Sequence, residues 1–150
     1  MRPGLLFLAV VLAACAEVDS PSPKMVLPPD YRTAFVPVRR CGPGNEHGLI
    51  SVVVRMRGEQ AAIYDNGPYP FPAGALIVKE EYRDNECTDL LGYTAMRKEA
   101  AGYFPEGGDW QWFKLDAYGT VITDGPQKSC AQCHTQKCGA RNRDLTCLEM

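Results

Sequence analysis

Two cysteines and a histidine near the end of the chain are spaced in a way that suits covalent cofactor chemistry. Cys130, Cys133 and His134 form a C-x-x-C-H motif. Two thiols at this spacing lie on one side of a helical turn, where each can bond a vinyl group of haem, and the adjacent imidazole can then reach the iron. The motif therefore predicts one covalently attached haem c, with thioether bonds from Cys130 and Cys133 and with His134 as the proximal iron ligand.

The same spacing also occurs in two other kinds of site. Together with Cys138 and Cys147, the motif cysteines could form an all-thiolate zinc site. A C-x-x-C pair can also be a thioredoxin-like redox centre, but no βαβ pattern surrounds this one. Export favours haem over both alternatives, because covalent haem attachment takes place outside the cytoplasm.

The place of the motif in the chain bears on the sixth coordination position of the iron. In electron-transfer cytochromes c a methionine well downstream fills that position, whereas here the only methionine after the motif is Met150. Upstream candidates are Met56, Met96, His47 and a lysine, each more typical of a structural role. We therefore expect an open distal site that binds small ligands such as nitric oxide, hydroxylamine or peroxide. A six-coordinate electron-transfer cytochrome is the alternative.

The first residues have the features of a bacterial lipoprotein signal. Arg2 precedes an uncharged apolar run over residues 4–14, which is too short to span a bilayer. The run ends Leu12-Ala13-Ala14-Cys15, which matches the lipobox. We predict a signal peptide over residues 1–14 and a diacylglycerol on the thiol of Cys15.

The residues that follow the signal peptide predict how the domain is attached to the membrane. Residues 15–26 are proline-rich and are expected to form a lipidated flexible tether, leaving residues 27–150 as the haem domain. Ala16 after Cys15 favours the outer membrane, so we expect a protein in the bacterial periplasm, held at the membrane by its lipid alone. The net charge of −2 shows no basic patch and gives no reason to expect nucleic acid.

Seven cysteines are many for a chain of 150 residues. Lipid and haem account for Cys15 and the two motif cysteines. Export permits disulfides among the remaining four, which are Cys41, Cys87, Cys138 and Cys147. The sequence does not choose among their three pairings, but we expect at least one bridge to pin the segment after His134.

Runs rich in β-branched and aromatic residues, bounded by turn residues, predict the scaffold. Strands are expected over residues 49–56, 75–82, 90–97 and 110–117, with a further edge strand over 33–39, where Pro37 stands. Short helices are expected over residues 59–66 and 127–135, the second presenting the haem cysteines. The predicted fold class is mainly β: an antiparallel sheet with a few short helices and a haem helix near the C-terminus.

Several blocks of sequence, in order, resemble the cytochrome P-460 family over roughly residues 27–146. They are Leu27-Pro28-Pro29-Asp30-Tyr31-Arg32, Phe71-Pro72-Ala73-Gly74-Ala75-Leu76-Ile77-Val78-Lys79-Glu80, Met96-Arg97-Lys98, Gly108-Asp109-Trp110 and the C-x-x-C-H motif. The resemblance implies a β-sheet fold, a homodimer and a five-coordinate c-type haem. Founding members oxidise hydroxylamine and carry a lysine bonded to a meso carbon of the haem, and that lysine aligns with Lys79. The related cytochromes c′-beta lack this cross-link and bind nitric oxide.

Lys79 is unusual in its own right, because it follows an apolar run that suggests a strand covered on both faces. Its amine either extends to solvent or enters a pocket, where desolvation would lower its pKa and favour the nucleophilic neutral form.

Two positions depart from the hydroxylamine oxidisers as we align them. Ser51 stands in place of a distal arginine, and Thr94 in place of a carboxylate that handles protons. Arg55, on the same strand face as Ser51, is a candidate substitute for the arginine, and Asp109 and Glu99 are candidate proton carriers.

Two function hypotheses follow for a haem with an open distal site. The first is an enzyme that oxidises hydroxylamine or reacts with nitric oxide, with an exported carrier protein accepting the electrons. The second is a non-catalytic nitric-oxide-binding cytochrome.

Overall fold

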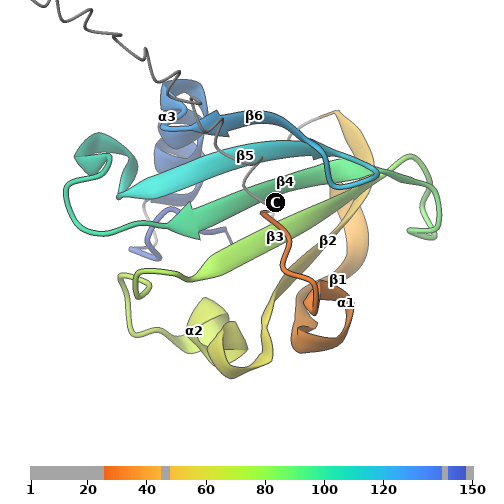
Figure 1. Ribbon diagram of the computed structural model, residues 1–150, viewed down its shortest axis with the longest axis horizontal. Helices are drawn as coiled ribbons and strands as arrows, with labels where there is room; N and C mark the ends of the chain where they lie inside the picture. Colours follow the sequence, from red (N-terminus) through yellow and green to blue (C-terminus); the bar gives the residue numbers. More distant parts are fainter. Residues whose placement is uncertain (1–25, 45–47, 140–141, 148–150) are drawn as a thin grey trace, which may run out of the picture.

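The computed structural model describes residues 26–44, 48–139 and 142–147. A six-stranded antiparallel sheet forms its centre, and the strands neighbour one another in the order of the sequence (Figure 1). The strands are β1 (Phe35–Gly44), β2 (Leu49–Arg57), β3 (Leu76–Tyr82), β4 (Leu90–Lys98), β5 (Trp110–Asp116) and β6 (Val121–Gly125). The predicted fold class, mainly β and antiparallel, is confirmed.

Short helices connect and flank the strands. They are α1 (Tyr31–Ala34), α2 (Ala61–Asn66), the 3₁₀ turns η2 (Gly58–Gln60) and η3 (Pro105–Gly107), and α3 (Lys128–Cys138), which carries the C-x-x-C-H motif. Within the described ranges, no helix has the length and apolar character needed to cross a bilayer.

The strands lie close to where the sequence places them, with two differences at the edges. β1 extends to Gly44, well beyond the predicted end at residue 39, and it is an edge strand as Pro37 indicates. β6 was not predicted, because three of its five residues are exposed and it therefore lacks the apolar alternation that marks a half-buried strand.

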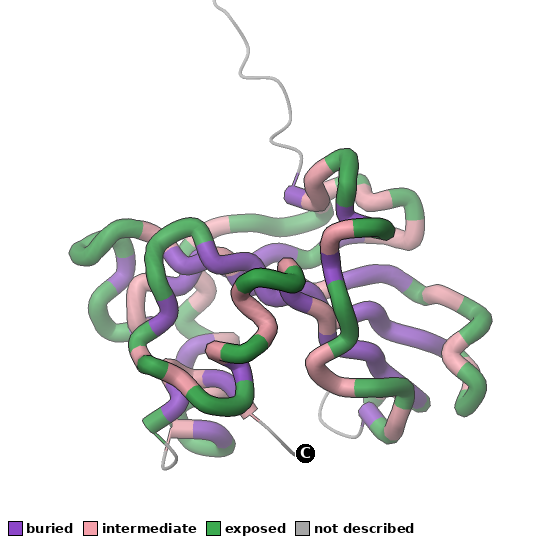
Figure 2. The backbone as a smooth tube through the Cα atoms, turned by 90° about the horizontal axis from the view of Figure 1, so that it is seen from below, coloured by how far each residue is buried: buried purple, intermediate pink, exposed green. Residues whose placement is uncertain are grey.

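Both faces of the sheet are covered, because successive side chains along a strand point to opposite faces. One face carries a core that includes Val54, Ile77 and Trp112, together with Ala131 of α3. The other face carries a second core in which Val26 and Tyr31 of the N-terminal segment pack on Val78 and its neighbours. Figure 2 shows the buried residues gathered along the strands and the exposed ones in the connecting loops. β3, in the middle, is buried at six of its seven positions, and Lys79 is the exception.

Candidate functional site

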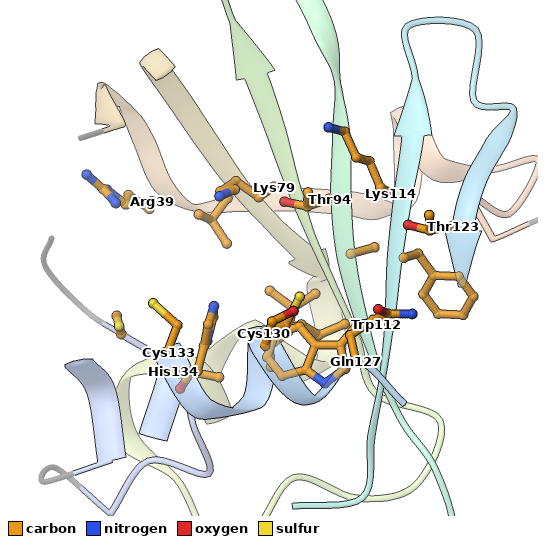
Figure 3. A pocket seen from close by; sticks show the side chains of 18 of the residues that line it. Arg39, Lys79, Thr94, Trp112, Lys114, Thr123, Gln127, Cys130, Cys133 and His134 are labelled. Atoms are coloured by element: carbon orange, nitrogen blue, oxygen red, sulfur yellow. The ribbon is translucent and has the colours of Figure 1, made fainter. Parts of the chain in front are cut away.

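One row of side chains crosses all six strands on the same face of the sheet. The register pairs Arg39 with Val54, Val54 with Lys79, Lys79 with Thr94, Thr94 with Lys114, and Lys114 with Thr123. Directly opposed residues of neighbouring strands share a face of the sheet. All six therefore line one side of a single cavity of about 350 Å³, and Figure 3 shows the labelled members in a line.

Helix α3 forms the opposite wall of this cavity. Cys130, Cys133 and His134 all line it, facing the sheet row across the open space (Figure 3). Residues three and four apart on a helix share one face, so the motif spacing itself places these groups together. The cavity volume falls within the range typical of cofactor and small-molecule pockets.

The cysteines of the described chain divide into paired and free ones. Cys41 is bonded to Cys87, and Cys138 is bonded to Cys147. Cys130 and Cys133 keep free thiols, although they are close in sequence. The zinc alternative needs the sulfurs of Cys138 and Cys147, which are engaged in a disulfide. Among the described residues, no cluster of three or more His, Cys, Asp and Glu side chains is arranged to hold a metal ion.

The ring of His134 is oriented by two contacts. Its Nδ1 lies 2.8 Å from the backbone carbonyl oxygen of Leu145. The ring also meets Trp112 edge to face, with ring centroids 4.7 Å apart. When Nδ1 carries the proton and donates to Leu145, Nε2 is the nitrogen with a lone pair for a metal. This is the orientation that a histidine ligand to haem iron requires.

Lys79 points into the cavity and does not extend to bulk solvent. Its side chain is 13% exposed, and its Nζ lies 3.5 Å from Oε1 of the buried Glu81. Thr94 donates a hydrogen bond of 3.0 Å to the same carboxylate oxygen. Burial lowers the pKa of Lys79 from its ordinary value, while the negative charge of Glu81 opposes that shift. The site thus presents an amine with increased neutral character across from His134.

Lys79 and Thr94 were named from the sequence, but several other residues of this row, Arg39 among them, were not. Nor was Glu81, which contacts Lys79 but is not among the residues that line the cavity. Arg39 belongs to the irregular edge strand, and it came into the row only through the pairing of β1 with β2. Glu81 lies two residues after Lys79, so strand alternation places both side chains on one face. This two-residue repeat of side chains along a strand could have identified Glu81 from the sequence as a neighbour of Lys79.

The structure corrects the expectation for Arg55. Arg55 and Ser51 are opposite Val78 and Tyr82 in the register, on the face of the sheet away from the cavity. There the Nε of Arg55 donates to Oε2 of the fully buried Glu80 at 2.9 Å. In β2 it is Val54 that lines the cavity, one residue away from Arg55 and hence on the opposite face. Arg55 is therefore an ion-pair partner in the second core and does not stand in for a distal arginine.

The other proton-carrier candidates lie outside the cavity wall. Oδ1 of Asp109 accepts hydrogen bonds from the backbone N–H groups of Gly102 and Phe104, which closes a turn. Glu99 pairs with Arg97. Neither is among the residues that line the cavity, whereas Thr94 is.

The candidate sixth ligands have different surroundings. Met56 is fully buried in the core next to the cavity, and Met96 lines the cavity beside Trp112. His47 and Met150 lie outside the described residues, as does Cys15 with the predicted lipid anchor.

Comparison with known proteins agrees with this arrangement. The sequence model of one family, described as cytochrome P460, matches residues 28–146. No curated protein is significantly similar to the chain in sequence. The matched range includes the whole sheet, α3, and the C-terminal turn that contacts His134.

Proposed function

The chain belongs to the cytochrome P460 family, which makes it a c-type haem protein, and on that premise we propose that it oxidises hydroxylamine or reacts with nitric oxide at an open distal side of its haem. The observation that carries this proposal is the placement of Lys79. Its amine, on a side chain that is 13% exposed, faces His134, Cys130 and Cys133 across one cavity.

The residues of the cavity fit the cofactor. Two free thiols lie beside an imidazole whose Nδ1 is already engaged, in a chain whose other described cysteines are paired. In the proposed holoprotein, Cys130 and Cys133 would form the thioether bonds, and His134 would bind the iron through Nε2. The haem supplies a redox-active iron with an open coordination position.

In this proposal Lys79 is the third covalent attachment. Its amine would take the place of a meso hydrogen of the macrocycle, a change that would remove two electrons and two protons, which an oxidant of the peroxide class would accept. The neutral form of the amine is the nucleophile, and burial favours that form. The bond perturbs the conjugated ring and so tunes its redox potential.

Polar groups on the sheet side of the cavity can form hydrogen bonds with a small ligand and exchange protons with it. The guanidinium of Arg39 and the hydroxyl of Thr94 both line the cavity and can donate hydrogen bonds to a bound nitrogen oxide or hydroxylamine. Glu81, hydrogen-bonded to Thr94, supplies a carboxylate near that position and can accept a proton. Glu81 therefore favours hydroxylamine oxidation.

Thr94 itself favours a second candidate function. A hydroxyl at this point of the wall can donate a hydrogen bond, but it is a poor proton acceptor at neutral pH. A protein that only binds nitric oxide needs no proton acceptor there. The second candidate is thus a nitric-oxide-binding cytochrome of the c′-beta kind.

The remaining parts of the proposal concern the surroundings of the domain. We propose that the protein is exported to the bacterial periplasm and anchored through a lipid on Cys15. An exported carrier protein takes up the electrons, and the functional unit is a homodimer. These parts rest on the sequence motifs and on the family.

The optical spectrum of the reduced protein, compared with that of Lys79→Ala, tests the proposal. We expect a strongly red-shifted Soret band in the wild type, because a nitrogen on the macrocycle perturbs its conjugation. In Lys79→Ala we expect the band of an ordinary five-coordinate c-type haem, retention of both thioether bonds, loss of hydroxylamine oxidation, and unchanged nitric oxide binding.

Lys137→Ala is the matched control, because this lysine is exposed on α3 and is not among the residues that line the cavity. It should keep the wild-type spectrum. Superimposable spectra of the wild type and Lys79→Ala would rule out the cross-link and favour the nitric-oxide-binding function. A sharp low-spin α-band in the wild type would instead indicate a six-coordinate electron-transfer cytochrome.

A further inference from the structure

The carboxylate of Asp144 collects hydrogen bonds from segments that are far apart in the sequence. The Nζ of Lys98 lies 2.8 Å from Oδ1 and 2.7 Å from Oδ2, and the backbone N–H of Phe71 donates to Oδ2 at 2.9 Å. The indole Nε1 of Trp110 donates to the backbone carbonyl of Asp144 at 2.9 Å. The side chains of Lys98 and Asp144 are only 9% and 8% exposed. A charge pair so far removed from water persists only when its geometry is good and its other hydrogen bonds are made.

The partners of Asp144 are residues that the haem chemistry does not use. Phe71, Lys98 and Trp110 each belong to one of the blocks by which the chain resembles its family, and none of them lines the haem cavity. Lys98 adds a hydrogen bond of 2.6 Å to the carbonyl of Gly108, and its Nζ lies 5.0 Å from the centre of the Trp110 ring. These contacts converge on one turn of the chain.

That turn has a backbone conformation that needs support. Asp144 and Leu145 have φ angles of 52° and 66°, in the left-handed region that side chains disfavour. The carbonyl of Leu145 is the group that accepts from Nδ1 of His134. Beyond the turn, Cys147 is bonded to Cys138, one helical turn after His134 on α3. The turn is therefore held to the sheet through Asp144 and to the helix through the disulfide.

We propose that Asp144 is a positioning residue for the proximal histidine. By fixing the turn to β4 and β5, it holds the Leu145 carbonyl at hydrogen-bond distance from His134. A hydrogen bond from Nδ1 makes the ring a stronger donor to iron through Nε2. Stronger donation stabilises ferric iron, and so lowers the reduction potential of the haem. This inference rests on the proposed ligation of the iron by His134.

The test uses the full haem-loaded chain and two variants, Asp144→Asn and Lys98→Met. The iron–histidine stretching band in the resonance Raman spectrum of the reduced protein reports the donor strength of the ring. An electrochemical titration gives the midpoint potential. In both variants we expect the band to move to lower frequency and the midpoint potential to move to a higher value.

Arg55→Met is the matched control, because it breaks a buried ion pair on the opposite face of the same sheet. It should lower stability without moving the band or the potential. If Asp144→Asn does not accumulate as a folded protein, Lys98→Met decides the question. A folded variant with the wild-type band and potential would show that the Asp144 contacts are structural only.

The outcome for the Asp144 and Lys98 variants can be distinguished from the outcome of the Lys79 test of the proposed function. Replacing Lys79 changes the distal side, so an absent cross-link does not alter the expected shifts in Asp144→Asn and Lys98→Met. A wild-type protein without any iron–histidine band would overturn both the ligation by His134 and the role of Asp144.

Discussion

The pKa of Lys79 depends on two influences that act in opposite directions. Desolvation in the cavity wall lowers it, and the carboxylate of Glu81, 3.5 Å away, raises it. Arg39, in the same row, adds a smaller lowering effect. The balance sets how much neutral amine is present at a given pH, and therefore how readily Lys79 can form the proposed bond to the macrocycle.

We predict that Glu81→Gln moves the pH dependence of cross-link formation to lower pH. Without the carboxylate, the pKa of Lys79 falls further, and the reactive neutral amine accumulates at a lower pH. The rate of appearance of the red-shifted Soret band after haem attachment, followed across pH, should rise with pH in both proteins and should rise earlier in the variant.

Glu86→Gln removes an exposed carboxylate and serves as the control for Glu81→Gln. It should keep the wild-type pH profile. A profile that is unchanged in Glu81→Gln, or moved to higher pH, would contradict the assigned role of Glu81.

At the scale of elements, β2 and β3 each serve two different sites. On one face they place Val54 and Lys79 in the cavity wall, and on the other Arg55 and Glu80 form a buried ion pair. The hydroxyls of Tyr31 and Tyr82 also donate to Glu80, at 3.0 Å each. Burial and the neighbouring carboxylate raise the pKa of Tyr82 to about 12. Both tyrosines therefore remain protonated donors at neutral pH.

We predict that Arg55→Met lowers the free energy of unfolding by about 1–3 kcal/mol, the usual cost when a buried polar group loses a partner. The haem spectrum should not change, because Arg55 faces away from the cavity. Denaturant unfolding and the optical spectrum of the same sample check both statements. A changed Soret band in this variant would indicate that Arg55 acts on the proposed haem site after all.

The two disulfides should differ in what they stabilise. Their cysteines are 46 residues apart for Cys41–Cys87 and 9 apart for Cys138–Cys147. In the chain-entropy model, the longer loop contributes about 4 kcal/mol and the shorter about 3 kcal/mol. The shorter one, however, holds the turn that contacts His134.

We therefore predict that replacing each cysteine pair by serines affects stability and the iron–histidine band in opposite order. Loss of Cys41–Cys87 should reduce the free energy of unfolding more, and should leave the iron–histidine band unchanged. Loss of Cys138–Cys147 should reduce it less, but should shift the band. Equal spectra in both double variants would contradict a role of the second disulfide at the haem.

At the scale of the whole molecule, the packed domain and its proposed anchor occupy different stretches of the sequence. Val26 is already buried in the second core, so the packed part of the chain begins no later than this residue. The proposed lipid lies on Cys15, and each buried methylene of such a lipid contributes about 0.8 kcal/mol to membrane binding.

We predict that Cys15→Ser moves the protein from the membrane fraction to the soluble periplasmic fraction. Its haem spectrum should remain that of the wild type, because residue 15 precedes the predicted haem domain in the sequence. Cell fractionation followed by mass spectrometry of the N-terminus checks this. A Cys15→Ser protein that still sediments with membranes would argue against a lipid anchor at this position.

The grouping of the C-x-x-C-H side chains on α3 could be predicted from the sequence because it is local. Residues three and four apart on one helix are neighbours whatever the rest of the chain does, so Cys130, Cys133 and His134 needed no tertiary information. The main strands were also predictable, because β-branched runs between turn residues prefer extended backbone. The short exposed strand β6 has no such signal.

The opposite wall of the site was decided by tertiary structure alone. Arg39, Lys79 and Thr94 come from separate strands, and they share a cavity only because of the register between those strands. A slip of one residue would turn every side chain of a strand to the other face, and the observed register places Val54 opposite Lys79 on the cavity face and Arg55 opposite Val78 on the other. The turn at Asp144 likewise depends on contacts from three distant segments. Such pairings follow from the packing of the whole chain, and no local pattern of residues encodes them.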